Sequence, residues 1–340
     1  MKYKNQKLNG LKLFITGGAG FIGSHIVNLL ANTTGVQITV YDNLSTGKLA
    51  NLEKIRSKIN FIKGDILNYK KLKDASKGFD VISHQAAQLE LIKGNKDLSL
   101  DVNINLLGTI NVARAAVENN IKKIINASSA CVYGQNISGK PSNEKSPTDP
   151  NWGYGASKLA AEKYLNIFAE DYKLSVFNLR YSIVYGPGEW YGRVLTIFLK
   201  RVIQNLPLVV FGNGEQLRDF VYVEDVASVH KHLLESSLSG CHAFNISTGK
   251  ATSINELASL VVHNISSNIK LIHEEIEEGA FSKIVKNRIR LPAELKIMWL
   301  DNKLAEKMVG WLPKVKLEEG LNEEFKWLKQ HKDAWKEIRI

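Results

Sequence analysis

The sequence predicts an α/β protein in which a doubly wound parallel sheet is followed by a smaller mixed α/β domain. Two observations carry this prediction. A short apolar run at 11–15 meets a glycine-rich turn at 16–20, and a helical pattern then begins. After this turn, apolar β-type runs alternate with helical patterns as far as Arg180, which is the order that a parallel sheet with crossover helices requires.

The glycine-rich turn has the composition of a phosphate site. Gly17 can adopt the backbone angles of a strand-to-helix turn, and Gly20 has no Cβ to obstruct a pyrophosphate. Gly23 lets the helix pack closely on its strand, and the helix N-terminus directs N–H groups toward the anion. Asp42 ends the next apolar run, ~20 residues later, where a dinucleotide fold holds the adenosine ribose. A carboxylate there repels a 2′-phosphate, so NAD is favoured over NADP, and we expect Lys48 nearby to lie in a solvated loop.

The remaining elements fit a Rossmann-type fold. The predicted strands are 36–41, 59–62, 80–83, 123–127 and 174–180, the long predicted helices are 99–118 and 153–172, and a capping box at 253–256 opens a further helix. The strand at 123–127 delivers Ser128 and Ser129 to its carboxyl end, where open parallel sheets bind ligands. Beyond the break at 185–188 the segments become shorter and more mixed. We therefore expect an NAD-binding domain at 1–181, to which the chain returns at about 222–247, and a substrate domain at 182–340.

Composition narrows the class of protein. The chain has 340 residues, of which 44% are hydrophobic, and no apolar run is long enough to span a bilayer. Its start lacks the apolar core of a signal peptide, and Cys131 and Cys241 lie in unrelated contexts, so we expect a cytoplasmic protein with reduced thiols. The formal charge of +11 is spread over scattered lysines, which favours anionic substrates over nucleic acid. The histidines show no metal-ligand spacing, so no metal is expected.

Tyr154 and Lys158 are the candidate catalytic pair. They lie four residues apart, so both side chains leave one face of the predicted helix. An ammonium beside a phenol lowers the pKa of the phenol and makes it a usable base near neutral pH. Ser129, at a strand end, is placed to hydrogen-bond the same substrate oxygen. After a glycine turn and a ribose carboxylate, this combination indicates hydride-transfer chemistry.

With these residues in place, the chain resembles the extended short-chain dehydrogenase/reductases, in the nucleotide-sugar epimerase/dehydratase group. The motifs that carry the resemblance fall in the order of that family over essentially the whole chain. They are TGGAGFIGSH (16–25), YDNLSTG (41–47), GDI (64–66), SSACVYG (128–134), YGASK (154–158), LRYSIVYGP (179–187), GNGEQLRDFVYVEDVA (212–227) and GWLPKVKLEEGL (310–321). An ordered series of this kind is specific for the family but not for the sugar.

The resemblance implies NAD as the cofactor. It assigns the pyrophosphate to Gly17, Gly20 and Gly23, the adenosine ribose to Asp42, and the adenine to Asp65 and Ile66. The further cofactor contacts that it implies are Phe21, Ile22, Asn43, Ser45, Gly47, Ala86, Ala87, Gln88, Asn103, Tyr154, Lys158 and Tyr181.

The resemblance also implies roles at the substrate. Tyr154 becomes the acid/base, Lys158 holds the nicotinamide ribose and tunes Tyr154, and Ser129 polarises the sugar hydroxyl. The implied contacts to the nucleotide sugar are Arg218 and Arg290 for the diphosphate (the latter through an alignment with an insertion), Val209 and Phe211 for the uracil, Met298 for the substituent at C2, and Arg193 near C6. Methionine is flexible and mid-sized, so we expect N-acetylated sugars to be handled poorly but not excluded.

Two departures from the family pattern bear on the reaction. Ala130 and Cys131 follow Ser129, where dehydratases of the family carry Asp-Glu and decarboxylases carry Glu. Neither residue can shuttle the additional proton, so both reactions are disfavoured, whereas epimerisation at C4 needs only one base and a returning hydride. Ile183 stands where many relatives place an asparagine that contacts the substrate, so substrate positioning must differ.

The expected activity is therefore that of an NAD-dependent nucleotide-sugar 4-epimerase that interconverts UDP-glucose and UDP-galactose or a close UDP-sugar. The alternatives are a UDP-glucuronate 4-epimerase, with Arg193 pairing the C6 carboxylate, and an epimerase or reductase acting on a dTDP- or GDP-sugar. For Arg193, the alternative role is a contact with a phosphate or with solvent. For the protein, the alternative outside enzymes is a regulator that binds NAD without catalysing a reaction.

The resemblance further implies a homodimer that packs through the helices at 99–118 and 153–172. We expect Trp299, Trp311 and Trp327 to belong to the core. The paired glutamates at 318–319 and 323–324 are expected on a solvated helix face.

Overall fold

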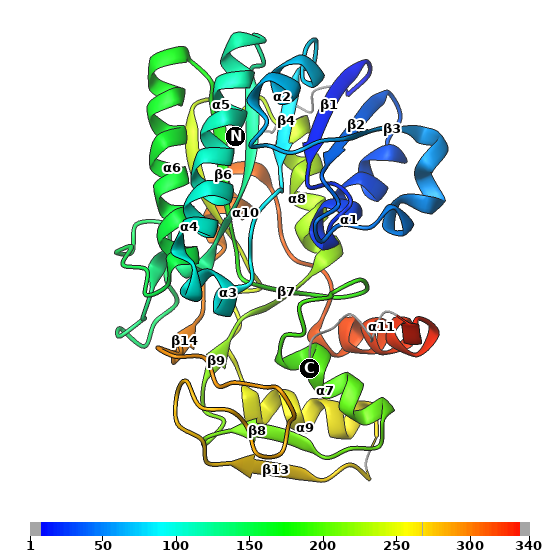
Figure 1. Ribbon diagram of the computed structural model, residues 1–340, viewed down its shortest axis with the longest axis vertical. Coiled ribbons are helices and arrows are strands. Elements are labelled where there is room, and N and C mark those ends of the chain that lie inside the picture. The colour runs from blue at the N-terminus through cyan, green and yellow to red at the C-terminus, as the bar shows by residue number, and fades with distance from the viewer. Residues whose placement is uncertain (1–7, 267, 334–340) are drawn as a thin grey trace.

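Seven parallel strands form the central sheet of the molecule (Figure 1). The computed structural model describes residues 8–266 and 268–333, so most of the segment used to judge a leader peptide lies outside the described residues. The strand order is β11-β6-β5-β4-β1-β2-β3. Their bounds are β1 Leu11–Thr16, β2 Val36–Asp42, β3 Ile59–Lys63, β4 Val81–His84, β5 Lys123–Ser129, β6 Ser175–Tyr181 and β11 Cys241–Ile246. The order reverses between β1 and β4, and that reversal is where doubly wound sheets bind ligands.

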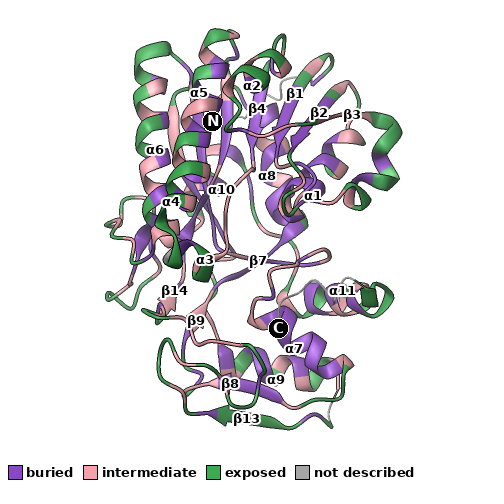
Figure 2. Ribbon diagram, viewed as in Figure 1, coloured by how far each residue is buried: buried purple, intermediate pink, exposed green. Residues whose placement is uncertain are grey.

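Helices cover both faces of this sheet, which confirms the predicted doubly wound fold. One face carries α1 Phe21–Ala31, α8 Val223–Glu235, α10 Lys303–Val309 and the 3₁₀ segment η1 Leu49–Lys58, and the other carries α2 Tyr69–Ala75, α5 Gly108–Glu118 and α6 Gly153–Tyr172. Strand β1 shows why both faces are apolar. Its Leu13 and Ile15 belong to the core under α1 and α8, while Phe14 belongs to the core under α5 and α6. Figure 2 shows the sheet buried and the outer surfaces of α5 and α6 exposed.

The predicted helix at 99–118 is helical but not regular. It consists of α4 Leu98–Asp101, a π-helical segment η2 Val102–Leu107, and α5. Helix α3 Leu91–Lys96 precedes it, and a 3₁₀ turn, η3 Ala130–Tyr133, follows β5. A π turn widens the helix locally and changes which side chains face inward.

The smaller part of the molecule lies below the carboxyl edge of the sheet in Figure 1. It contains the helices α7 Val194–Ile203, α9 Ile254–Asn264 and α11 Leu317–Gln330 around one apolar cluster. Its short strands form pairs and one triplet: β7 Ile183–Tyr185 with β10 Phe220–Tyr222, β8 Leu208–Phe211 with β13 Leu271–Glu274, and β9 Leu217–Arg218 with β12 Thr252–Ser253 and β14 Ile297–Met298. The capping box predicted at the start of α9 is confirmed, with Ser253 and Glu256 bonding each other's backbone. No helix of the described ranges is long and apolar enough to cross a membrane.

The expectation of a solvated glutamate face on α11 is wrong for Glu324. Its side chain is buried, and its carboxylate accepts hydrogen bonds from the Thr196 hydroxyl at 2.6 Å and the Gly186 N–H at 2.8 Å. It thereby ties α11 to α7 and to the loop after β7. Of the three tryptophans, Trp311 is fully buried, whereas Trp299 and Trp327 are half-buried. The helical period of α11 brings Glu324 onto the same face as the buried Leu321 and Leu328.

Burial raises the pKa of Glu324 to about 8, from an ordinary value of 4.5. The folded chain therefore keeps a proton that the unfolded chain releases. The contribution of Glu324 to stability is present in full below about pH 4.5 and is lost as the pH rises through about 8.

We predict that Glu324→Gln flattens this pH dependence. Glutamine keeps the shape and an acceptor for the Gly186 N–H, but it cannot ionise. The free energy of unfolding of the wild type should fall more between about pH 5 and pH 8 than that of the variant. Urea denaturation midpoints measured across this range will check it. Parallel curves for the two proteins would contradict the prediction.

Candidate active site

The turn after β1 is shaped by contacts that only glycine allows. Gly17 has a φ of +68°, and a Cβ there would lie 2.5 Å from the backbone nitrogen of Ala86. A Cβ on Gly23 would lie 2.2 Å from the carbonyl oxygen of Gly17, so α1 packs directly on the turn itself. At Gly20, a Cβ would meet only the Gly17 oxygen, at 3.2 Å, and α1 begins without a side-chain cap. An uncapped helix start beside such an open turn is a ready anion site.

Asp42 lies beside this turn, at the carboxyl end of β2. Its side chain is buried, and its two oxygens accept hydrogen bonds from the N–H groups of Ala19 at 3.0 Å and Leu44 at 2.8 Å. Burial raises the pKa of Asp42, and the two N–H bonds oppose that rise. Gly47 packs against the carboxylate, where a Cβ would lie 3.0 Å from each oxygen. The carboxylate is thus held in one orientation next to the phosphate-type turn.

The predicted adenine residues lie on the neighbouring loops. The Asn43 amide donates to the Asp65 carboxylate at 2.9 Å, and the Ser45 N–H donates to the Asn43 side-chain oxygen at 2.9 Å. Ile66 is buried against Gly108 of α5. These bonds join the loops after β2 and β3 into one surface beside Asp42.

Asn103, predicted as a cofactor contact, is exposed, whereas Asn105, two residues further along the π segment, is buried. The Asn105 side chain accepts from the Gln88 N–H at 2.9 Å and donates to the Gln88 carbonyl at 3.1 Å. It thus fixes the stretch after β4 that holds Ala86, Ala87 and Gln88, all half-buried. Asn105 therefore supports the predicted cofactor edge from within the fold.

Ser129, Tyr154 and Lys158 meet where β5 ends and α6 begins. Ser129 is the last residue of β5, and Tyr154 and Lys158 lie in the first two turns of α6. The Lys158 ammonium donates to the Ala127 carbonyl at 2.8 Å and lies 5.9 Å from the centre of the Tyr154 ring. Tyr154 and Lys158 therefore share one face of α6, as their spacing predicts, and this face is turned toward the end of β5.

The expected lowering of the Tyr154 pKa is not what the structure gives. Burial raises the pKa of Tyr154, and the hydrogen bond from Ser129 is one of the influences that oppose it. Burial also lowers the pKa of Lys158 to about 8, whereas the charges of the Asp101 and Glu162 carboxylates act to raise it. Sequence spacing shows that an ammonium and a phenol are neighbours, but it does not show that both are removed from water, and this removal dominates both pKa values.

One pocket runs from this pair into the smaller part of the molecule. It is lined by every residue predicted to contact the substrate: Ser129, Tyr154, Arg193, Val209, Phe211, Arg218, Arg290 and Met298. Tyr181, predicted at the cofactor, also lines it, and its hydroxyl donates to Gln85 at 3.1 Å. Residues separated by up to 169 positions along the chain, from Ser129 to Met298, thus share one cavity.

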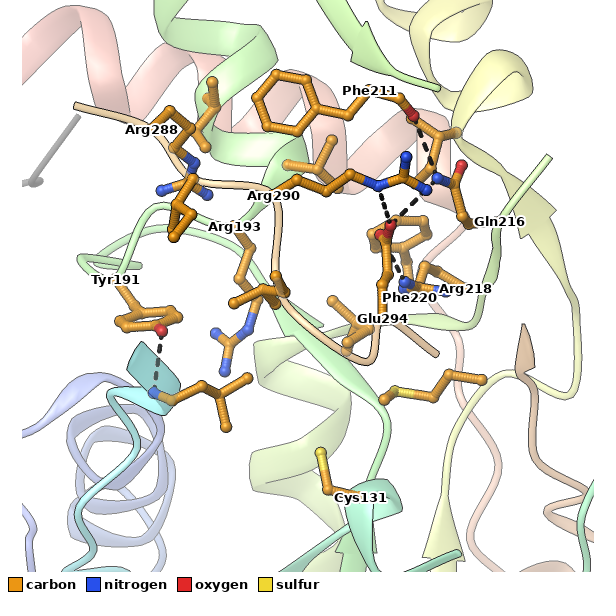
Figure 3. A pocket seen from close by; sticks show the side chains of 18 of the residues that line it. Cys131, Tyr191, Arg193, Phe211, Gln216, Arg218, Phe220, Arg288, Arg290 and Glu294 are labelled. Carbon is orange, nitrogen blue, oxygen red and sulfur yellow. Dashed lines mark hydrogen bonds and ion pairs between the residues drawn. The ribbon is translucent and has the colours of Figure 1, made fainter. Parts of the chain in front are cut away.

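Two arginines of the pocket converge on one carboxylate that the sequence reasoning missed. Glu294 accepts from Arg218 at 3.3 Å and from Arg290 at 3.1 Å, and the Gln216 amide lies 3.3 Å away (Figure 3). Arg290 follows an insertion relative to the family pattern, and the structure nonetheless brings it beside Arg218. The sequence feature that could have predicted this ion pair is the spacing of four residues between Arg290 and Glu294. The pair forms a cationic wall held in place by an internal anion.

Arg193 lies apart from this pair, on the other side of the pocket in Figure 3. Its guanidinium is 3.5 Å from the buried Glu189, whose oxygens accept the N–H groups of Tyr191 and Gly192. The Tyr191 hydroxyl in turn accepts from the N–H of Leu91, the first residue of α3, at 3.2 Å. Glu189 therefore shapes the loop that carries Arg193, and this loop reaches across the pocket to α3.

Arg288 is a second missed residue of the pocket. Arg288 donates a hydrogen bond to the Gly192 carbonyl at 2.7 Å and lines the pocket. The sequence feature that could have identified it is its place two residues before Arg290 in an extended segment. Across the described ranges, no group of three His, Cys, Asp or Glu side chains is placed to hold a metal ion.

The glycine turn, the oriented ribose-type carboxylate and the phenol–ammonium pair are the parts of a dinucleotide-dependent enzyme, and an arginine-walled pocket adjoins them. Residues 13–247 match the model of the NAD dependent epimerase/dehydratase family. The chain belongs to this family, and its cofactor is NAD.

Known relatives differ in the nucleotide and in the reaction. A protein of Methanocaldococcus jannaschii, provisionally named as a UDP-glucose 4-epimerase, is 36% identical over 94% of this chain and 99% of its own length. The dTDP-D-glucose 4,6-dehydratase of Homo sapiens is 32% identical over 96% of this chain and 92% of its own.

Similar solved structures differ in the sugar. UDP-glucose 4-epimerase from Thermotoga maritima, with UDP-glucose, has a TM-score of 0.82 at 30% identity and covers 94% of this chain and 99% of its own. UDP-glucuronic acid 4-epimerase from Bacillus cereus, with UDP-glucuronic acid and NAD, has a TM-score of 0.84 at 27% identity with the same coverage. The comparisons thus support a nucleotide-sugar enzyme and leave its sugar open.

Proposed function

We propose that this chain is a UDP-sugar 4-epimerase that interconverts UDP-glucose and UDP-galactose. The observation that carries the proposal is that two kinds of group line one pocket. Ser129 and Tyr154 line it together with Arg218 and Arg290, which form the cationic wall. A nucleoside diphosphate sugar has the matching polarity, since its sugar is neutral and its diphosphate anionic. Val209 and Phe211 offer an apolar surface beside the arginines for a base such as uracil.

Each of the three catalytic residues has a separate role in the proposed reaction. Tyr154 takes the proton of the C4 hydroxyl and returns it, Ser129 holds the same oxygen by a hydrogen bond, and the Lys158 ammonium stabilises the phenolate. NAD, held by the glycine turn, Asp42 and Lys158, supplies the hydride acceptor for C4 and the hydride that returns. Burial of the site excludes water from the intermediate ketone, which must turn over before hydride returns to its other face.

The surroundings of Ser129 support epimerisation over dehydration. Ala130 is buried, and Cys131 lines the pocket with a thiol whose pKa is raised by burial. A protonated thiol and a methyl group cannot supply the carboxylic acid that elimination requires. The one carboxylate among the pocket-lining residues, Glu294, is paired with Arg218 and Arg290.

Tyr154→Phe is predicted to remove nearly all turnover while leaving folding and NAD binding intact. General acid–base groups are worth about 10²–10⁴-fold, and Tyr154 serves both half-reactions. Purified protein is incubated with UDP-glucose and no added cofactor, and UDP-galactose is measured by chromatography. Near-normal turnover in the variant would refute the role of Tyr154. Consumption of stoichiometric NADPH by the wild type would point to a reductase instead.

A second candidate substrate, UDP-glucuronate, is favoured by the number of arginines. Arg193, Arg218, Arg288 and Arg290 all line the pocket. A diphosphate accounts for the Arg218–Arg290 pair, and Arg193 lies apart from that pair (Figure 3). A guanidinium at that place suits a bidentate pair with a carboxylate at C6 of the sugar.

If Arg193 contacts a carboxylate, Arg193→Ala should reduce kcat/KM for UDP-glucuronate at least ten-fold more than for UDP-glucose. Arg218→Ala is the matched control, because loss of a diphosphate contact should weaken both substrates alike. Equal losses in Arg193→Ala, or no uronate turnover in the wild type, would exclude this second candidate.

We also propose a homodimer through α4–η2–α5 and α6, as expected from the resemblance. Exposed apolar side chains gather on these adjacent helices, with Leu98 59% and Ile167 54% accessible, and Val102, Leu107 and Tyr164 also exposed. Burial of such a patch against a second copy removes it from water.

Ile167→Glu together with Leu107→Glu should convert the dimer to a monomer, because two charges would enter its centre. Light scattering at micromolar concentration measures the mass. Phe281→Glu is the control, since Phe281 is 68% exposed on a different loop and should leave the mass unchanged. A monomeric wild type would overturn the proposal.

A further inference from the structure

Trp152 lies at the start of α6, two residues before Tyr154, at a position where helices usually carry a small capping side chain. It immediately precedes the first helical residue, and its backbone is extended. Serine, threonine, aspartate or asparagine at such a position bonds a free N–H group of the first turn. The indole makes no bond of this kind, although the Trp152 carbonyl accepts the Ala156 N–H at 3.0 Å. The side chain is therefore used for something other than capping the helix.

The Trp152 indole joins α6 to the segment that carries Arg290 and Glu294. Its N–H donates to the Pro292 carbonyl at 3.0 Å. Pro292 lies midway between Arg290 and Glu294 in the sequence, and the ion pair of these two residues, at 3.1 Å, closes the turn around it. One hydrogen bond thus links the helix that carries Tyr154 to the cationic wall.

Packing fixes the indole at both ends of this link. Trp152 is buried and lines the pocket, and it belongs to one apolar cluster with Ala130 of η3, with Leu295 beside Glu294, and with Met298 of β14. A buried side chain that is also hydrogen-bonded has few alternative rotamers. The indole therefore holds α6 and the turn at 290–294 at a fixed separation.

The same segment reaches Arg218, the other arginine of the wall. The Leu217 N–H donates to the Lys296 carbonyl at 2.9 Å, and β14 pairs with β9, the strand that carries Arg218. The Arg218 guanidinium also contacts Glu294 at 3.3 Å. Both arginines therefore belong to one bonded unit, and Trp152 links that unit to the start of α6.

We propose that Trp152 is a positioning residue that sets the separation between the cationic wall and Tyr154. This inference rests on the proposed function, in which the wall binds the diphosphate and Tyr154 acts at C4 of the sugar. The diphosphate and the sugar belong to one molecule, so the place of the wall decides where C4 lies. Proton transfer to Tyr154 requires the C4 oxygen within hydrogen-bond reach, and a misplacement of about 1 Å costs about 10²-fold in rate.

Trp152→Phe tests the proposal, because phenylalanine keeps an aromatic ring in the cluster and removes the N–H. The kcat for UDP-glucose should fall at least about ten-fold, since C4 is no longer held at Tyr154. The Kd for UDP, measured by calorimetry, should change less than about two-fold, because Glu294 still pairs with both arginines. The Gln135 side chain also still accepts the Lys296 N–H at 3.1 Å.

Two outcomes of this experiment would overturn the proposal. One is an unchanged kcat in the variant. The other is a loss of UDP affinity as large as the loss of kcat, together with a lower melting temperature, because this would show a role in folding alone.

A second measurement needs no substrate and so separates this inference from the proposed function. Backbone amide hydrogen exchange, followed by mass spectrometry, reports how tightly residues 290–295 are held. Their amides should exchange faster in Trp152→Phe than in the wild type, whatever the sugar substrate is. Unchanged exchange would overturn the proposal even if the variant is inactive. Faster exchange in a protein that does not turn over UDP-glucose would refute the proposed substrate and still support the link through Trp152.

Trp299→Phe is the matched control. The Trp299 indole N–H also donates to a backbone carbonyl, that of Gly249 at 2.9 Å, and Trp299 directly follows Met298. Trp299 lies outside the described lining of the pocket. This variant should leave both kcat and the exchange of residues 290–295 as they are in the wild type. Equal effects in both variants would mean that any lost indole bond has this result, and would refute a specific role for Trp152.

Discussion

The contact between the first turn of α1 and the glycine turn after β1 is the constraint on which the site depends. Gly23 lies against the Gly17 carbonyl, and Gly17 lies against the backbone at Ala86, so three backbone segments meet with no side chain between them. This contact places the start of α1 at the carboxyl edge of the sheet, next to Asp42. The same edge receives Ser129 from β5 and the Tyr154–Lys158 face from α6. The sheet edge therefore holds the proposed cofactor turn and the proposed catalytic residues close to one another.

Several buried charges around the pocket are paired with an opposite charge. Glu294 stands between Arg218 and Arg290, Glu162 holds Arg180, and Glu189 holds the loop that carries Arg193. A buried ion without such a partner would lose its charge or destabilise the fold. The pairs at the pocket wall keep the arginines oriented for an anionic ligand. The Arg180–Glu162 ion pair lies deeper in the sheet and stabilises the structure beneath β5, the strand that carries Ser129.

The residues proposed for the reaction and those proposed for the substrate lie on different parts of the chain. Ser129 ends β5 and Tyr154 and Lys158 lie on α6, whereas the pocket arginines lie on the loop at 186–193, on β9 and in the segment at 275–296. The similar solved structures include both a UDP-glucose and a UDP-glucuronic acid epimerase, so one fold serves different sugars. We therefore propose that the side chains of these segments select the sugar.

The sequence by itself determined the features that depend on local spacing. The glycine turn, the strands of the parallel sheet, the bounds of α6 and the capping box of α9 follow from patterns a few residues long, and the structure confirms each of them. The tertiary structure decided everything that depends on which groups lose contact with water. It buried Glu324 on a helix face that reads as polar, buried Asn105 while Asn103 stayed exposed, set Glu294 between two arginines, and raised the pKa of Tyr154 where spacing alone suggested a fall. The reason is that periodicity fixes the direction of a side chain relative to its neighbours along the chain, whereas desolvation depends on residues that are distant in sequence.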